Sequence, residues 1–283
     1  MHEFELILQQ LRFRICQWGK DSDPPILLLH GWLDQAASWL QTAEVLASYG
    51  YRVLAMDQRG HGCTAHIAAS AHYHFPDYIS DVAFLQQALQ LSDMTVIGHS
   101  MGGTVAAQYA ALQPQHVRQL ILIEGMGPPH ETPKMALRRY RDHLHQRMQP
   151  CFHQPMPSIK DAAQKLQRYH PYIADELALF LAERVTKKQQ NQQYMWRWDP
   201  RHRKRSATGF DATRHIQLLS HIEAPTVLIW GEQSPFHKLA DLPQRIAALA
   251  HLHSQHYLPG GHSPHYEHPQ QLADLLVRIV QGI

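Results

Sequence analysis

Short apolar runs alternate with helical patterns along most of this chain, and this alternation strongly constrains its fold. The apolar runs lie at 26–29, 51–56, 94–97, 117–123 and 225–230. They lack the polar alternation of a half-exposed strand, so each should be a strand buried on both faces of a parallel sheet. Helical patterns fall between or after them, at 36–49, 76–91, 101–112, 238–250 and 266–280. The order predicts an α/β fold with a doubly wound, mostly parallel sheet.

Two further features bring the predicted sheet to eight strands. Residues 3–17 alternate apolar and polar side chains about Gln9 and Gln10, a period of two that favours an antiparallel hairpin. A weaker run at 255–258 adds a last strand.

One interval interrupts the alternation. Between 127 and 221 we find no strand-like run, only helical stretches joined by proline-rich loops, at 135–148, 160–169 and 175–187. The sequence therefore predicts a core formed by 1–126 and 222–283, with a helical lid at 127–221 inserted after the sixth strand. The total of 283 residues suits one large α/β domain with an inserted module.

Composition excludes several classes of protein. No apolar run approaches the roughly 18–20 residues that span a bilayer, so we expect no membrane span. The formal net charge is only +2, and the basic run at 201–205 has no aromatic stacking platform, so we expect no nucleic-acid partner. Three widely spaced cysteines and an N-terminus without signal-peptide character predict a reducing, cytoplasmic location.

The strongest chemical signal is the sequence Gly98-His99-Ser100-Met101-Gly102. It follows a predicted strand and opens a predicted helix, the context in which a Gly-x-Ser-x-Gly motif forms a nucleophile elbow. The small glycines let strand and helix approach closely while the serine hydroxyl stands exposed above the sheet. We therefore predict that Ser100 is a nucleophile.

Four motifs in order give the chain a resemblance to lid-bearing α/β-hydrolases of the esterase, haloperoxidase and C–C hydrolase type. They are the elbow itself and the segments at 30–32, 57–62 and 260–262. The resemblance covers nearly the whole chain outside the lid. It implies that the backbone N–H groups of Trp32 and Met101 form an oxyanion hole, and that His262 is the catalytic base.

Nearby histidines allow another interpretation of the region around His262. His265 and His268, with Glu267, could in principle bind a metal ion, but no matching ligand group stands elsewhere in the sequence. We therefore expect no metal and no cofactor. The lid segment at 196–201 is also similar to that of serine-hydrolase-like proteins, and Trp196 and Trp198 there should either line the substrate pocket or seat the lid.

The acid of the expected triad departs from the common pattern. The family usually places an aspartate where this chain has Ser234, which carries no charge to stabilise an imidazolium. Glu124 ends the strand at 117–123, the position from which some α/β-hydrolases supply their acid. We take Glu124 as the predicted acid and Glu232 as the second candidate.

These residues predict a serine hydrolase that cleaves a small, fairly apolar ester or thioester through an acyl-enzyme. A C–C bond hydrolase or a cofactor-free perhydrolase would use the same triad. The missing aspartate at position 234 leaves one alternative of another class, a non-catalytic protein of this fold that binds a ligand.

Overall fold

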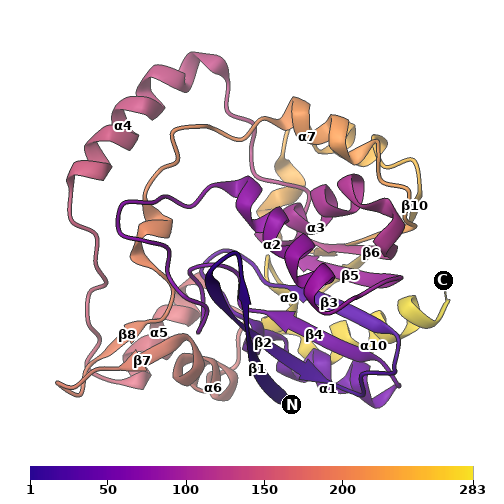
Figure 1. Ribbon diagram of the computed structural model, residues 1–283, viewed down its shortest axis with the longest axis horizontal. Coiled ribbons are helices and arrows are strands. Elements are labelled where there is room, and N and C mark those ends of the chain that lie inside the picture. The colour runs from indigo at the N-terminus through magenta and orange to yellow at the C-terminus, as the bar shows by residue number, and fades with distance from the viewer. Residues whose placement is uncertain (283) are drawn as a thin grey trace.

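The computed structural model describes residues 1–282, which form an eight-stranded sheet with helices on both faces (Figure 1). The strand order is β1-β2-β4-β3-β5-β6-β9-β10. β1 and β2 form an antiparallel hairpin at one edge, and the other six strands are parallel to one another. This confirms the predicted fold. The strands are β1 (His2–Leu8), β2 (Leu11–Trp18), β3 (Pro25–Leu29), β4 (Arg52–Met56), β5 (Met94–His99), β6 (Val117–Ile123), β9 (Thr226–Gly231) and β10 (Leu252–Leu258).

Helices cover both faces of the sheet because its strands are apolar on both sides. α1 (Leu40–Ser48) and α10 (Pro269–Gly282) pack together over one face, around a core that includes Trp39, Leu46 and Leu276. α2 (Phe75–Ala88) and α3 (Met101–Leu112) cover the other face. The long helix expected at 266–280 is divided, because Pro269 begins α10 after a short α9 (Pro264–Glu267).

The segment between β6 and β9 contains the inserted elements. α4 (Ala136–Met148), α5 (Ile159–Tyr169) and α6 (Asp175–Val185) follow one another there. α5 and α6 pack against each other, and their apolar cluster includes Tyr266 from the core. α7 (Ala212–Leu219), at the end of the segment, lies against α3 and α8 (Leu242–Ala247).

One expectation for this segment was wrong, because it does contain strands. β7 (Thr186–Lys188) and β8 (Tyr194–Trp196) form a short antiparallel pair after α6. Each has only three residues, too few for an alternating pattern to be recognised in the sequence. α6 accordingly ends at Val185, where the predicted helix continued to 187.

α4 differs from every other long helix of the described chain in its packing. None of its residues is buried, and Figure 1 shows it standing away from the body of the molecule. Within residues 1–282, no helix is both long and apolar enough to cross a membrane.

Candidate active site

Ser100 lies on a sharp turn between β5 and α3, with φ 51° and ψ −114°. The neighbouring glycines make this turn possible. A Cβ added at Gly98 would lie 2.4 Å from the carbonyl oxygen of Gly102, and one at Gly102 would lie 2.3 Å from that of Leu29. Any larger residue would push the helix away from the sheet, so the motif forms the elbow expected from the sequence.

His262 faces Ser100 from the loop after β10. Its Nε2 atom lies 2.8 Å from Ser100 Oγ, within hydrogen-bond distance. The ring of Phe236 stacks on the His262 imidazole with centroids 4.4 Å apart. His99 Nε2 lies 2.7 Å from the His262 carbonyl oxygen. These two contacts fix both the ring and the backbone of His262.

Glu124 follows β6 directly and is buried. Its Oε2 atom lies 3.1 Å from His262 Nδ1, so Ser100, His262 and Glu124 form a continuous chain of polar contacts. The Gly231 N–H donates to Glu124 Oε1 at 2.7 Å, and the Ser234 hydroxyl donates to Oε2 at 2.5 Å. These two donors and the imidazole together fix the position of the Glu124 carboxylate.

The second candidate acid lies elsewhere. Glu232 is exposed, and its side chain makes no polar contact with His262 within the described residues. Its backbone N–H donates to the carbonyl of Leu258, which keeps the chain in register beside β10.

Sequence reasoning missed the roles of Ser234 and Phe236. Ser234 stands where the sequence comparison expected an aspartate, and its hydroxyl donates to the Glu124 carboxylate. The contact of Ser234 with Glu124 could have been predicted from the sequence. A carboxylate follows β6 and a hydrogen-bond donor follows β9, and these strands are neighbours in the sheet.

Trp32 lies in the loop after β3, and Met101 directly follows Ser100 at the start of α3. Their backbone N–H groups donate to no other protein atom within residues 1–282. The loop carrying Trp32 is anchored by His30, whose Nε2 accepts from the Gln58 N–H at 2.9 Å. The Gln58 side chain in turn donates to the His30 carbonyl at 2.6 Å.

A cavity of about 520 Å³ opens beside these two residues. Trp32 and Met101 line it at one end, and Tyr73, Phe75 and Phe210 contribute aromatic surface. Charged side chains, among them Lys204, Arg205 and Arg214, share the walls with these aromatic rings.

Trp196 and Trp198 are not among the residues that line this cavity. The two rings lie 6.5 Å apart and nearly parallel, and Trp198 is buried. The Trp198 carbonyl lies 2.6 Å from His153 Nε2, and the Arg203 guanidinium lies over the indole ring. These contacts fit the seating of the inserted segment, one of the two roles expected for them.

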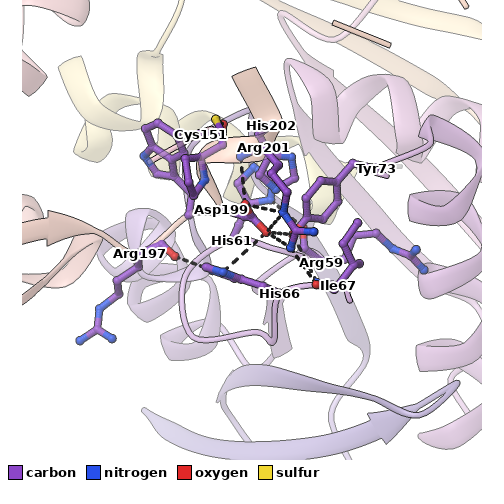
Figure 2. Close-up of polar contacts among 12 residues, drawn as sticks. Arg59, His61, His66, Ile67, Tyr73, Cys151, Arg197, Asp199, Arg201 and His202 are labelled. Carbon is purple, nitrogen blue, oxygen red and sulfur yellow. Dashed lines mark hydrogen bonds and ion pairs between the residues drawn. The ribbon is translucent and has the colours of Figure 1, made fainter. Parts of the chain in front are cut away.

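A polar network joins the inserted segment to the loop after β4 (Figure 2). At its centre Asp199 accepts from the Tyr73 hydroxyl at 2.8 Å, and pairs with Arg201. The Arg201 guanidinium also donates to the carbonyls of Ile67 and Ala68, each at 2.7 Å. We call this set of contacts the Asp199 network.

Histidines pack beside the Asp199 network. His202 stacks on His61 with ring centroids 4.0 Å apart. Burial lowers the pKa of His202 to about 4, and burial with the nearby His202 holds the pKa of His61 well below its usual value. Both rings are therefore neutral at pH 7.

One group within residues 1–282 has the composition of a metal site. Asp34, His99 and His265 place possible ligand atoms within 4.8 Å of one another, all buried. The Asp34 carboxylate, however, already accepts from the Tyr266 hydroxyl and lies 3.3 Å from His265 Nε2. Burial opposes its ionisation, but the hydrogen bond and charge of His265 outweigh this and lower the pKa of Asp34. This arrangement ties the loop of Trp32 to α9.

The comparisons with known proteins agree with this fold. Residues 24–269 match the family model described as the alpha/beta hydrolase fold, and the chain belongs to this family. The class that fold and turn define is therefore the alpha/beta hydrolase family.

Individual relatives have more specific names than the family model. The chain is 29% identical over 235 residues to a serine hydrolase-like protein of Dictyostelium discoideum, covering 77% of this chain and 62% of that one. It is 28% identical over 240 residues to a serine hydrolase-like protein of Danio rerio, covering 81% of this chain and 71% of the other. The chain thus spans only part of these relatives.

Among solved structures, a thioesterase domain from the curacin biosynthetic pathway has a TM-score of 0.88. It is 29% identical in sequence, and the match covers 98% of this chain and 99% of the other. The likeness therefore includes the inserted segment as well as the sheet.

Proposed function

We propose that this hydrolase cleaves a small carboxylic ester or thioester through an acyl-enzyme on Ser100. The observation that carries the proposal is the unbroken chain of contacts from Ser100 Oγ through His262 to the carboxylate of Glu124. A serine hydroxyl is a poor nucleophile alone, and such a chain is the arrangement that activates it.

Each residue of the triad has a definite role in this reaction. His262 Nε2 takes the proton of Ser100 as the hydroxyl attacks the carbonyl carbon, and then passes it to the leaving alcohol or thiol. Glu124 holds His262 in the tautomer with a proton on Nδ1 and stabilises the imidazolium. Water then attacks the acyl carbonyl carbon and gives a proton to His262 Nε2. His262 passes this proton to Ser100 Oγ as the carboxylic acid leaves, which restores the free serine.

The N–H groups of Trp32 and Met101 form the oxyanion hole in this proposal. Both are free of protein acceptors within the described residues, and both residues line the cavity where a carbonyl would lie. Two fixed donors lower the energy of the charge that develops on the carbonyl oxygen.

The cavity supports a small substrate with an apolar part, and the thioesterase likeness supports including thioesters. The segment at 127–221 acts as a lid in this proposal, because it supplies Phe210, His202 and other walls of the cavity. α7 forms its seat on the core through α3 and α8.

Hydrolysis of p-nitrophenyl esters of increasing chain length tests the proposal. We expect turnover that is lost in Ser100→Ala but kept in the matched control Ser80→Ala, whose serine is exposed on α2. Labelling of wild-type protein by a fluorophosphonate, absent in Ser100→Ala, would confirm the nucleophile independently of the substrate. If neither turnover nor labelling occurs, the proposal is wrong and a ligand-binding role takes its place.

A further inference from the structure

α4 is oriented opposite to a usual surface helix, because its polar side chains face the protein. Asp142 pairs with Arg205 at 2.7 Å, and Arg139 donates to the Ser206 carbonyl at 3.0 Å. Gln146 Oε1 accepts from the Arg205 N–H at 2.6 Å. A helix on a protein surface normally packs its apolar stripe against the core and exposes its polar face.

The apolar side chains of α4 point away from the protein instead. Leu137 is 63% exposed, Tyr140 51%, Leu144 62% and Met148 84%. At 3.6 residues per turn these positions fall on one side of the helix, so they form a single stripe along its outer face. We call this the α4 stripe. Phe152, just beyond the helix, is also 66% exposed.

The charges around the α4 stripe are of one sign. Arg138 and Arg141 lie along one side of it and Arg147 along the other, and none of the three pairs with a carboxylate within residues 1–282. The only acidic residue of α4 is Asp142, which is turned inward onto Arg205. The outer face of α4 is therefore apolar along its centre and cationic along its edges.

We propose that α4 docks this protein onto a membrane surface rich in anionic phospholipids. A helix with an apolar stripe flanked by arginines lies in the plane of the interface, with its apolar side chains below the headgroups and its cations against the phosphates. The methylene groups of each arginine can lie against the apolar region while the guanidinium stays at the level of the headgroups.

Two observations favour a lipid surface over a protein partner. α4 is a projecting ridge that a soft, flat surface can receive without a matching groove (Figure 1). Pairing of α4 with α4 of a second copy would place two faces with unpaired arginines and no outward carboxylate against each other, and like charges at close range oppose association.

Docking through α4 also brings the cavity to the interface. His143, on the inward side of α4, lines the cavity that Met101 also lines. The docking itself does not depend on the proposed hydrolysis.

Flotation with phospholipid vesicles tests the docking. The vesicles are phosphatidylcholine alone, or phosphatidylcholine mixed equally with phosphatidylglycerol, and the protein carries Ser100→Ala so that no lipid is consumed. We expect flotation with the anionic vesicles only. The double variant Leu137→Ser/Leu144→Ser should reduce partitioning by about tenfold or more, because each leucine loses apolar burial. Arg138→Gln/Arg141→Gln should also reduce it, and should weaken its dependence on salt.

Matched controls come from exposed residues on the core. Leu112→Ser, at a position 53% exposed on α3, and Arg278→Gln on α10 should leave flotation unchanged. Circular dichroism checks that every variant is folded. Absence of flotation by the Ser100→Ala protein, or flotation unaffected by the double leucine change, would overturn the proposal. A dimer that dissociates in the leucine variant would assign the α4 stripe to a second copy instead.

Discussion

The hydroxyl of Ser234 donates to Glu124 Oε2 at 2.5 Å, and the same oxygen lies 3.1 Å from His262 Nδ1. A carboxylate at the end of β6 and a hydroxyl after β9 thus meet at one point beside the imidazole. The position at which related hydrolases carry their aspartate remains part of the site here, as a donor to a glutamate on the neighbouring strand.

Replacing Glu124 by Gln should lower kcat by about 100–10,000-fold, because an amide cannot stabilise the imidazolium and can favour the wrong tautomer. The side chain keeps its size, so the melting temperature should change little. The matched control is Glu232→Gln, at an exposed glutamate, which should keep wild-type turnover. Loss of turnover in the control with retention in Glu124→Gln would make Glu232 the acid.

Ser234→Ala should lower kcat by roughly 3–30-fold with little change in KM. The substitution removes one donor from the Glu124 carboxylate but leaves the Gly231 N–H in place, so the acid is held less firmly. Steady-state kinetics over a range of pH measures this. An unchanged rate and pH profile would show that the hydroxyl has no positioning role.

A carboxylate after β9, at position 234, should be able to replace the carboxylate of Glu124 after β6. In Glu124→Gln/Ser234→Asp the new carboxylate arises next to the point where Glu124 meets His262, so turnover should recover at least about tenfold over Glu124→Gln alone. Ser234→Asp alone is the control. It places two carboxylates together in a buried site, which raises the pKa of one of them and lowers stability. A double variant no faster than Glu124→Gln would contradict the prediction.

Arg245→Met should destabilise the protein by about 3–5 kcal/mol. Arg245 is fully buried in α8 and donates to the carbonyls of Met126, Gly127 and Pro128, which lie just after β6. Methionine fills similar space but satisfies none of these acceptors, and it leaves Asp241 without its partner. Urea unfolding measures the change. A loss below about 1 kcal/mol would show that water replaces the guanidinium.

Stability should fall as the pH is lowered from about 6.5 towards 4. Burial lowers the pKa values of His170, His202 and His215 to about 4, whereas in the unfolded chain they titrate near the usual value of 6.5. In this window the unfolded state binds more protons, so acid favours unfolding. We expect the melting temperature to fall by about 5–10 °C between pH 7 and pH 5. His202→Gln should reduce that fall, and an unchanged melting temperature would contradict the prediction.

The sequence was sufficient for an eight-stranded, mostly parallel sheet, because buried parallel strands are apolar throughout and stand out from helical periodicity. The turn at Ser100 was predictable too, since glycines between a strand and a helix are typical of a strand-turn-helix elbow. The position of Glu124 at the end of a strand beside that of Ser100 made it the first choice of acid. Glu124 directly follows β6, which pairs with β5 in the sheet, so no long loop separates it from the turn at Ser100.

Other features depend on contacts that periodicity does not encode. The hydrogen bond from Ser234 needs the path of the loop after β9. β7 and β8 have three residues each, too few for a strand pattern to be recognised. The pattern of α4 shows an amphipathic helix but does not say which face meets the protein. That orientation is decided by Arg205, a residue far along the chain whose backbone and side chain bind the polar face.

Two parts of the inserted segment are attached to the protein in different ways. Around Asp199 the segment is bound to the loop after β4 through the side chains of Asp199, Tyr73 and Arg201. α4 has no buried residue, and its side-chain contacts with the protein are polar ones to Glu131, Arg205 and Ser206. We therefore expect that, if the cavity widens, the contacts of α4 separate before those of the Asp199 network.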